Sequence, residues 1–218
     1  MIEGMIYKTQ AYKESARLLF TYTSQGKVTL IAEGAQKMNH PYRVLGQYLT
    51  MISFQESPKS MVTLKDAKLL NTYKKIKDDY DTLKYASLIL EIIDHLVIED
   101  MPHNIIFSHV KAALDIDDLK TASLSFSFKM LKIFGYELNL KPDGRKVLGV
   151  NIELGGLFYE GESHIMDLDV TQATQLLKLT RYPYDQLETL SESSYQVLKN
   201  FLLKYVQFHL QTTLKAIK

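Results

Sequence analysis

The sequence predicts an α+β protein of two domains, in which a five-stranded OB-type β-barrel precedes an α-helical domain with an irregular insert. Three observations lead to this prediction. Residues 1–77 contain short apolar, β-branched runs separated by turn residues. Residues 78–218 contain apolar residues at helical spacing. Between about residues 137 and 166, glycine and proline interrupt that spacing, and this insert has no cysteine.

Five short runs in the first domain have the composition of strands. A Ser-Gln-Gly turn joins the second run to the third, which predicts a hairpin, and Ser57-Pro58-Lys59-Ser60 predicts a turn before the last run. Small barrels built from so few strands are commonly of the OB type, which often binds single-stranded nucleic acid. The predicted strands are Met1–Thr9, Arg17–Thr23, Gly26–Ala32, Leu45–Phe54 and Met61–Leu69.

Five helices are predicted in the remainder of the chain. Asp117 or Asp118 can cap the third of them, and Gly135 can end it. The insert between the third and fourth helices is expected to be irregular, with short hairpins. The helices are predicted over Lys74–Val97, Asn104–Leu114, from the aspartate cap to Phe134, after Asp169-Val170-Thr171 to about Leu179, and from Ser191 to Leu214.

Composition excludes several classes of protein. The chain has 218 residues, of which 46% are hydrophobic, so it can bury a core and is not a disordered chain. It has no cysteine, which excludes disulfides and thiolate metal sites. No long apolar run suggests a signal peptide or a membrane span. We therefore expect a cytoplasmic protein without a membrane partner.

Charge is distributed unevenly along the chain. Residues 1–77 contain twelve Lys and Arg against five Asp and Glu, a local net charge of +7, whereas residues 78–218 contain fourteen against twenty, a net charge of −6. This asymmetry is typical of a nucleic-acid-binding module joined to a different module, although charge also fluctuates along ordinary chains. The predicted domains are accordingly 1–77, for nucleic-acid binding, and 78–218.

A basic loop follows the strand at Gly26–Ala32, and no acidic residue occurs in it after Glu33. Cations on such a loop can contact phosphates, and aromatic side chains beside them can stack on bases. The alternatives are ordinary solvated cations and tyrosines that fill the core. The predicted DNA-binding residues are Lys37 and Arg43, with Lys13, Arg17 and Lys27 of second rank, and Tyr12 and Tyr42 for stacking.

Motifs of the common enzyme classes are absent. The sequence has no GxxxxGK[ST] or GxGxxG phosphate-binding loop and no HExxH metal helix. We therefore predict a protein that is not an enzyme and needs no metal or cofactor. Two alternatives remain: an interaction scaffold whose barrel binds protein, and a nucleic-acid enzyme with an unrecognised site.

Several segments, in order along the chain, resemble the RecO family of recombination mediator proteins. They cover nearly the whole chain, and their order makes the resemblance specific. They are Gly4-Met5-Ile6, Tyr12–Ser15, Thr23, Gly26-Lys27, Ala32–Lys37, Leu64–Leu70, Tyr85–Asp94, Leu131–Tyr136 and Tyr205–Lys215.

The resemblance implies an OB barrel followed by a helical domain, and a role in DNA recombination and the repair of DNA damage. Such proteins bind single- and double-stranded DNA and anneal complementary strands. With RecR they load RecA onto DNA coated by single-strand-binding protein, at the nucleoid and without catalysis. Many members have a four-cysteine zinc module in the insert, which this chain has lost because it lacks cysteine. Apolar residues are expected to replace the zinc: Leu148, Val150, Ile152, Leu157 and Phe158.

The resemblance also implies contact with the C-terminal tail of single-strand-binding protein, which is acidic and ends in apolar residues. Such a tail needs an apolar pocket with a cation beside it. We expect this contact on the helix Ala122–Phe134, through Lys129, Lys132 and Phe126. The alternative is that the apolar residues of this helix serve the core.

Overall fold

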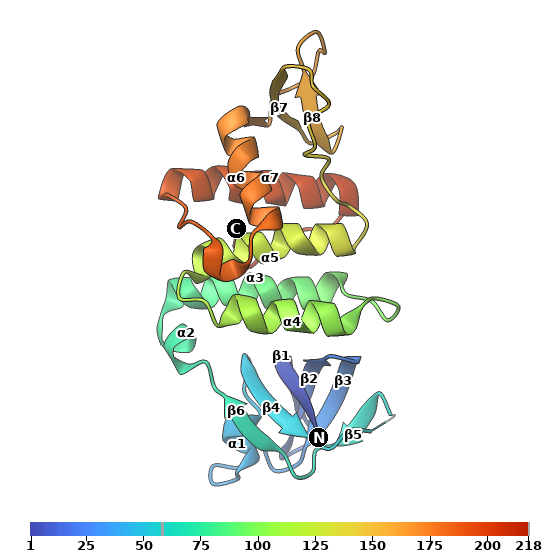
Figure 1. Cartoon of the computed structure of the whole chain (residues 1–218). Helices are drawn as coiled ribbons and strands as arrows, with labels where there is room; N and C mark the ends of the chain where they lie inside the picture. Colours follow the sequence, from blue (N-terminus) through green and yellow to red (C-terminus); the bar gives the residue numbers. More distant parts are fainter. Residues whose placement is uncertain (58, 218) are drawn as a thin grey trace. The chain divides into compact units, whose positions relative to one another are not determined.

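The computed structural model describes residues 1–57 and 59–217 and divides into two compact units, Met1–Lys111 and Ala112–Lys218 (Figure 1). The turn predicted at residues 57–60 includes Pro58, which lies outside the described residues. No helix among the described residues has the length and apolar character needed to cross a membrane.

The first unit is built on a mixed sheet, followed by helices, which confirms the α+β class. The sheet has six strands instead of five, in the order β5-β3-β2-β1-β4-β6. β2 and β3 form the predicted antiparallel hairpin, and β1 pairs antiparallel with both β2 and β4. The strands are β1 (Ile2–Tyr12), β2 (Ala16–Thr23), β3 (Gly26–Ala32), β4 (Thr50–Phe54), β5 (Met61–Thr63) and β6 (Lys68–Asn71).

The sixth strand arises because the predicted strand Met61–Leu69 is interrupted. Its first part pairs parallel with β3 and its second part antiparallel with β4, on opposite edges of the sheet (Figure 1). Between them Leu64 turns into the core and Asp66 adopts a left-handed backbone conformation with φ of 49°. An aspartate tolerates this conformation better than most residues. One chain segment thus covers both edges, as in an OB-type barrel whose last strand is broken.

The predicted strand Leu45–Phe54 is also shorter than expected. Tyr42–Leu45 forms the short helix α1, and β4 begins only at Thr50. Leu49, just before it, is fully buried with a φ of 51°. This left-handed residue reverses the chain between helix and strand, so the extended pairing cannot begin earlier.

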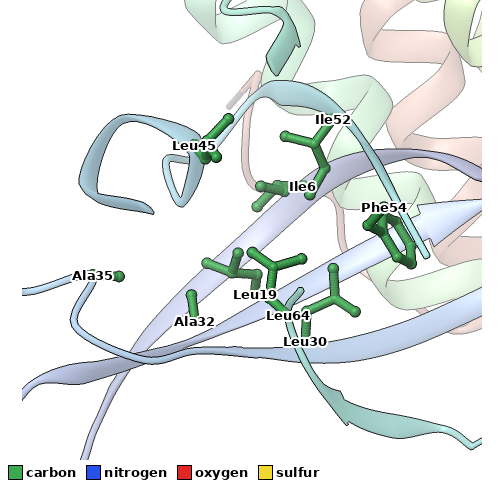
Figure 2. Close-up of a cluster of buried hydrophobic side chains, with 9 residues drawn as sticks. All are labelled: Ile6, Leu19, Leu30, Ala32, Ala35, Leu45, Ile52, Phe54 and Leu64. Atoms are coloured by element: carbon green, nitrogen blue, oxygen red, sulfur yellow. The ribbon is translucent and has the colours of Figure 1, made fainter. Parts of the chain in front are cut away.

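The core of the sheet contains residues from β1 to β4, from the loop after β3 and from the segment between β5 and β6 (Figure 2). Strand residues alternate toward this core, which explains the β-branched and leucine-rich runs in the sequence. Two of its members, Ala35 and Leu45, come from the loop, so the loop is anchored at two points. The cluster is Ile6, Leu19, Leu30, Ala32, Ala35, Leu45, Ile52, Phe54 and Leu64.

The helices that begin in the first unit are α2 (Lys74–Asp78), α3 (Tyr80–Leu96) and α4 (His103–Leu114). The prediction of one helix over Lys74–Val97 is therefore wrong at Asp79. That residue is extended, and its carboxylate accepts a hydrogen bond from the Thr82 backbone nitrogen at 2.8 Å. An N-cap of this kind starts a new helix because it satisfies the free amides of the first turn.

The second unit contains α5 (Leu119–Ile133), α6 (Val170–Arg181), the 3₁₀ turn Tyr184–Gln186 and α7 (Glu192–Leu210). The Asp118 cap of α5 is confirmed, and Asp169 caps α6 through a capping box with Gln172. The last helix ends at Leu210 instead of Leu214, because Gln211 takes a left-handed conformation with a φ of 52°.

The insert forms a small three-stranded sheet, in the order β8-β7-β9, and so contains the hairpin expected of it. Its strands are β7 (Val147–Asn151), β8 (Gly156–Tyr159) and β9 (Leu168–Asp169). Of the five apolar residues expected to replace a zinc site, Val150, Ile152 and Phe158 are buried. Leu148 and Leu157 are only half-buried.

Candidate nucleic-acid interface

Four of the predicted cationic residues gather at one end of the barrel. Tyr12 and Ala16 close the β1–β2 hairpin, so Lys13 lies in its turn. Arg17, next in β2, pairs with Ala32 at the end of β3, where the basic loop begins. The hairpin turn and the loop therefore lie side by side. We call this surface the basic end; it consists of Lys13, Arg17, Lys37 and Arg43.

Hydrogen bonds hold the loop against the hairpin. The Gln36 backbone nitrogen donates to the Ser15 carbonyl at 3.0 Å, and Gln36 Nε2 donates to the Ala16 carbonyl at 2.5 Å. Arg17 Nη1 donates to the carbonyl of Gly46, at the other side of the loop, at 3.3 Å. With Ala35 and Leu45 in the core, the segment that includes Lys37 and Arg43 is held at both sides.

Three of the four cations of the basic end are available for a ligand. Lys13, Lys37 and Arg43 are exposed, and none of them forms an ion pair within the part of the chain that the structure describes. Two exposed carboxylates, of Glu14 and Glu33, lie in the same turns and reduce the local charge. The surplus of unpaired cations still favours an anionic partner such as a phosphate backbone.

The two predicted stacking residues are partly covered. Tyr12 is half-buried, and Lys13 Nζ lies 5.2 Å from its ring centroid. Tyr42 is half-buried against the core, with its ring edge-on to that of His40 at 5.2 Å between centroids. Each ring can therefore offer only part of its surface to a base.

Lys27 is placed differently from the other predicted cations. It lies near the opposite end of β3, and its Nζ donates to the carbonyls of Asp94 at 3.0 Å and Val97 at 2.8 Å. Burial lowers its pKa, and the nearby Asp94 carboxylate opposes that effect. Lys27 fastens the end of α3 to the barrel, and the structure does not bring it to the basic end.

The residues predicted for a protein tail contact do not form one surface. Phe126 is fully buried. Lys129 Nζ donates to the Tyr182 carbonyl at 2.6 Å and lies 3.9 Å from the ring centroid of Tyr184; burial lowers its pKa to about 8. Lys132 is exposed and pairs with Glu137 at 3.1 Å. Of these three residues, only Lys132 is exposed, and Lys129 is half-buried.

An apolar groove that the sequence did not reveal lies at the end of α7. It measures about 620 Å³, and Phe208 in its wall is 52% exposed. Lys204 lies one helical turn before Phe208, which places a cation beside the apolar surface. The groove is lined by Leu203, Lys204, Gln207, Phe208, Thr213 and Leu214.

A zinc site does not fit the residues of the insert. The chain supplies no thiolate, and among residues 1–57 and 59–217 no group of three His, Asp or Glu side chains lies close enough together to hold a metal ion. Structural zinc requires four such ligands in a tetrahedral arrangement.

Comparison with known proteins places the chain in a family. Residues 1–73 match the family model for the recombination protein O N terminal, and residues 77–217 match that for its C terminal. The DNA repair protein RecO of Desulforamulus reducens is 25% identical over 234 aligned positions, which cover 99% of this chain and 91% of that protein.

Two clostridial relatives match over a shorter range. The DNA repair protein RecO of Clostridium acetobutylicum is 28% identical over 144 residues, and that of Clostridium perfringens is 30% identical over 149. These matches cover 63% and 62% of this chain, and 58% of each relative, so the chain spans less than two thirds of either. Because the two family models together match nearly the whole chain, the chain belongs to the recombination protein O (RecO) family.

Proposed function

We propose that this chain is a DNA-binding recombination mediator that binds single- and double-stranded DNA, anneals complementary strands and acts in recombinational repair without catalysing a reaction. The observation that carries the proposal is the basic end, where exposed cations without ion pairs lie on an anchored loop beside a hairpin turn. Membership of the RecO family supports it.

The basic end suits contact with the sugar-phosphate backbone. Lys37 and Arg43 would each neutralise a phosphate and release counterions, which makes binding sensitive to salt. Such contacts position DNA without specifying its sequence. Annealing requires two backbones to be held close against their mutual repulsion, and a surface with several unpaired cations lowers that repulsion. Partial stacking on Tyr12 and Tyr42 would add to the affinity for single strands.

We further propose that the chain cooperates with RecR and single-strand-binding protein and so promotes RecA loading. The α7 groove has the chemistry that an acidic tail with an apolar end requires, because Phe208 is exposed in it and Lys204 stands beside it. Phe126 is buried, so we assign the tail to this groove instead of α5.

The DNA contact is tested by changing Lys37 and Arg43 together to Glu. Loss of two phosphate contacts should flatten the slope of log affinity against log salt by roughly two units for duplex and somewhat less for single strands. Annealing should fall with binding. Stability should change by only about 0.5 kcal/mol, because both side chains are exposed.

The matched control is the double change of Lys199 and Lys204 to Glu, which alters net charge equally but lies in the second unit. Equal losses of DNA affinity in both variants would mean that overall charge, and not the basic end, governs binding. A wild-type protein that binds neither form of DNA would favour the protein scaffold, and cleavage of DNA with a divalent metal would favour an enzyme.

The tail contact is tested by titrating the full chain with an acidic peptide that ends in apolar residues. Phe208→Ala and Lys204→Glu should each weaken peptide binding at least fivefold and leave DNA affinity unchanged. Lys132→Glu is the control on α5, because Lys132 is the exposed residue among those predicted to contact the tail. If Lys132→Glu abolishes peptide binding and the α7 variants do not, the tail binds at α5 and our assignment is wrong.

A further inference from the structure

A second hollow lies in the first unit, where the last strand of the barrel is broken. It measures about 580 Å³ and lies between the end of β4, the segment that follows it, and β5. The hollow exists because β5 pairs with β3 while β6 pairs with β4, so no ladder joins β5 to β4 among the described residues. We call it the seam groove; its lining includes Leu30, Phe54, Lys59, Met61, Val62 and Lys65.

The seam groove combines an apolar floor with a cationic rim. Leu30 and Phe54 belong to the barrel core, and Met61 is 51% exposed beside them. Lys59 and Lys65 are exposed and form no ion pair with a described residue. Glu56 is the acidic residue of the lining, and its Oε1 accepts a hydrogen bond from Gln25 Nε2 at 2.6 Å.

One end of the groove lies at the end of β3, from which the basic loop starts. β5 runs parallel to β3, with Thr63 opposite Ile31, and the Leu64 nitrogen donates to the Ile31 carbonyl at 2.9 Å. Lys65, the next residue, is therefore brought to the end of β3, where the basic loop starts. Lys59 precedes β5 and stands at the other end of the groove.

We propose that the seam groove accepts unpaired bases of single-stranded DNA, with Lys59 and Lys65 holding the adjacent phosphates. The proposal rests on the proposed function and adds a path for the strand, from the basic end along β5. A volume of about 580 Å³ is in the range of small-ligand sites and large enough for a base. Bases in a duplex are paired and stacked, so the groove distinguishes single strands from duplex.

The test compares two variants with a matched control. Lys59→Glu with Lys65→Glu removes the rim cations, and Met61→Ala removes exposed apolar surface without changing charge. The control, Lys74→Glu with Lys75→Glu, makes the same charge change on α2, where both lysines are exposed. Affinities are measured by anisotropy with a labelled single strand and a labelled duplex, and base environment by the emission of 2-aminopurine in the strand.

The rim variant should lose about tenfold in single-strand affinity relative to the control, and Met61→Ala about fivefold, the scale of one lost base contact. The duplex affinity of the rim variant should equal that of the control, and the duplex affinity of Met61→Ala should equal that of the wild type. The 2-aminopurine emission should change on binding wild type and not on binding the variants.

Equal loss for single strand and duplex would overturn the proposal, because the lysines would then be ordinary backbone contacts. Unchanged single-strand affinity in both variants would also overturn it. If Lys37→Glu with Arg43→Glu still weakens DNA binding and flattens its salt dependence in that case, the proposed function stands without the groove. If Met61→Ala weakens binding of the acidic peptide and leaves single-strand affinity intact, the groove is a peptide site instead.

Discussion

Three of the lysine side chains in this protein lie in different electrostatic environments. Lys37 is exposed on an anchored loop, Lys27 donates to the carbonyls at the end of α3, and Lys129 lies over the ring of Tyr184. Only the first has its charge available to an outside anion. The residue type alone could not distinguish these roles, because each depends on which backbone carbonyls and rings lie within reach of the ammonium group.

Lys129 should make stability depend on pH. Burial lowers its pKa to about 8 from an ordinary value of 10.5. Between those values the unfolded chain binds a proton that the folded chain does not, so the contribution of this group to stability rises with pH across that window. Lys129→Met cannot titrate. The melting temperature of wild type should therefore rise relative to Lys129→Met between pH 7.5 and 9.5.

Lys132→Met is the control on the same helix, since Lys132 is exposed and contacts Glu137. It should follow wild type over the same pH range. Parallel melting curves for wild type and Lys129→Met would show that the hydrogen bond to Tyr182 and the Tyr184 ring compensate the burial of the charge.

At the scale of elements, the insert is held by polar contacts in addition to its apolar residues. Arg145 Nη1 donates to Glu162 Oε1 at 2.6 Å and Nη2 to Asp143 Oδ2 at 2.7 Å, while its guanidinium lies 4.1 Å from the Tyr159 ring centroid. His209 Nε2 of α7 donates to the Ile152 carbonyl at 2.7 Å. These contacts connect the segments that flank the strands to one another, and the insert to α7. A bound metal ion would stabilise an insert in the same way.

Arg145→Ala should loosen the insert selectively. Amide exchange over residues 145–162 should accelerate, with no change in α5, and Lys146→Ala, which breaks the neighbouring pair with Glu160, should have a smaller effect. The guanidinium of Arg145 holds the pKa of Asp143 and of Glu162 below their usual values. Its stabilising effect is therefore present at a pH above the usual carboxyl pKa values and is lost as the pH falls through the lowered pKa values.

A metal chelator should leave both the melting temperature and this exchange pattern unchanged, because we expect no metal binding to be coupled to folding. Stoichiometric zinc in the purified protein, or a melting temperature that falls with chelator, would contradict this account of the insert.

At the scale of the whole molecule, part of the positive charge of residues 1–77 is neutralised by acidic residues within the first unit. Residues 78–111 contain two lysines against seven acidic residues. Lys8 pairs with Asp94 at 3.2 Å and Lys111 with Glu3 at 2.6 Å. The excess of cations in the barrel is thus offset where the helices pack on it, and stays available at the basic end. The predicted domain boundary after residue 77 stays a prediction, since the first compact unit extends to Lys111.

Local patterns in the sequence were enough for the fold class, for the hairpin of β2 and β3, and for a helix cap at Asp117 or Asp118, of which Asp118 is the one observed. These features depend on neighbouring residues: alternation along a strand, a turn, or a side chain that reaches the amide three residues on. The family resemblance rests on the same local segments, and the family models bear it out.

Contacts between distant residues decided the rest. Ser125 is a polar residue by sequence, yet α5 buries it, and its hydroxyl donates to the carbonyl of Leu179, 54 residues further along the chain, at 2.7 Å. The predicted last strand is broken because its first part, β5, pairs with β3 and its second part, β6, pairs with β4. The seam groove and the cations left unpaired exist only once the sheet has formed, because they depend on which edges and charges meet across long stretches of chain.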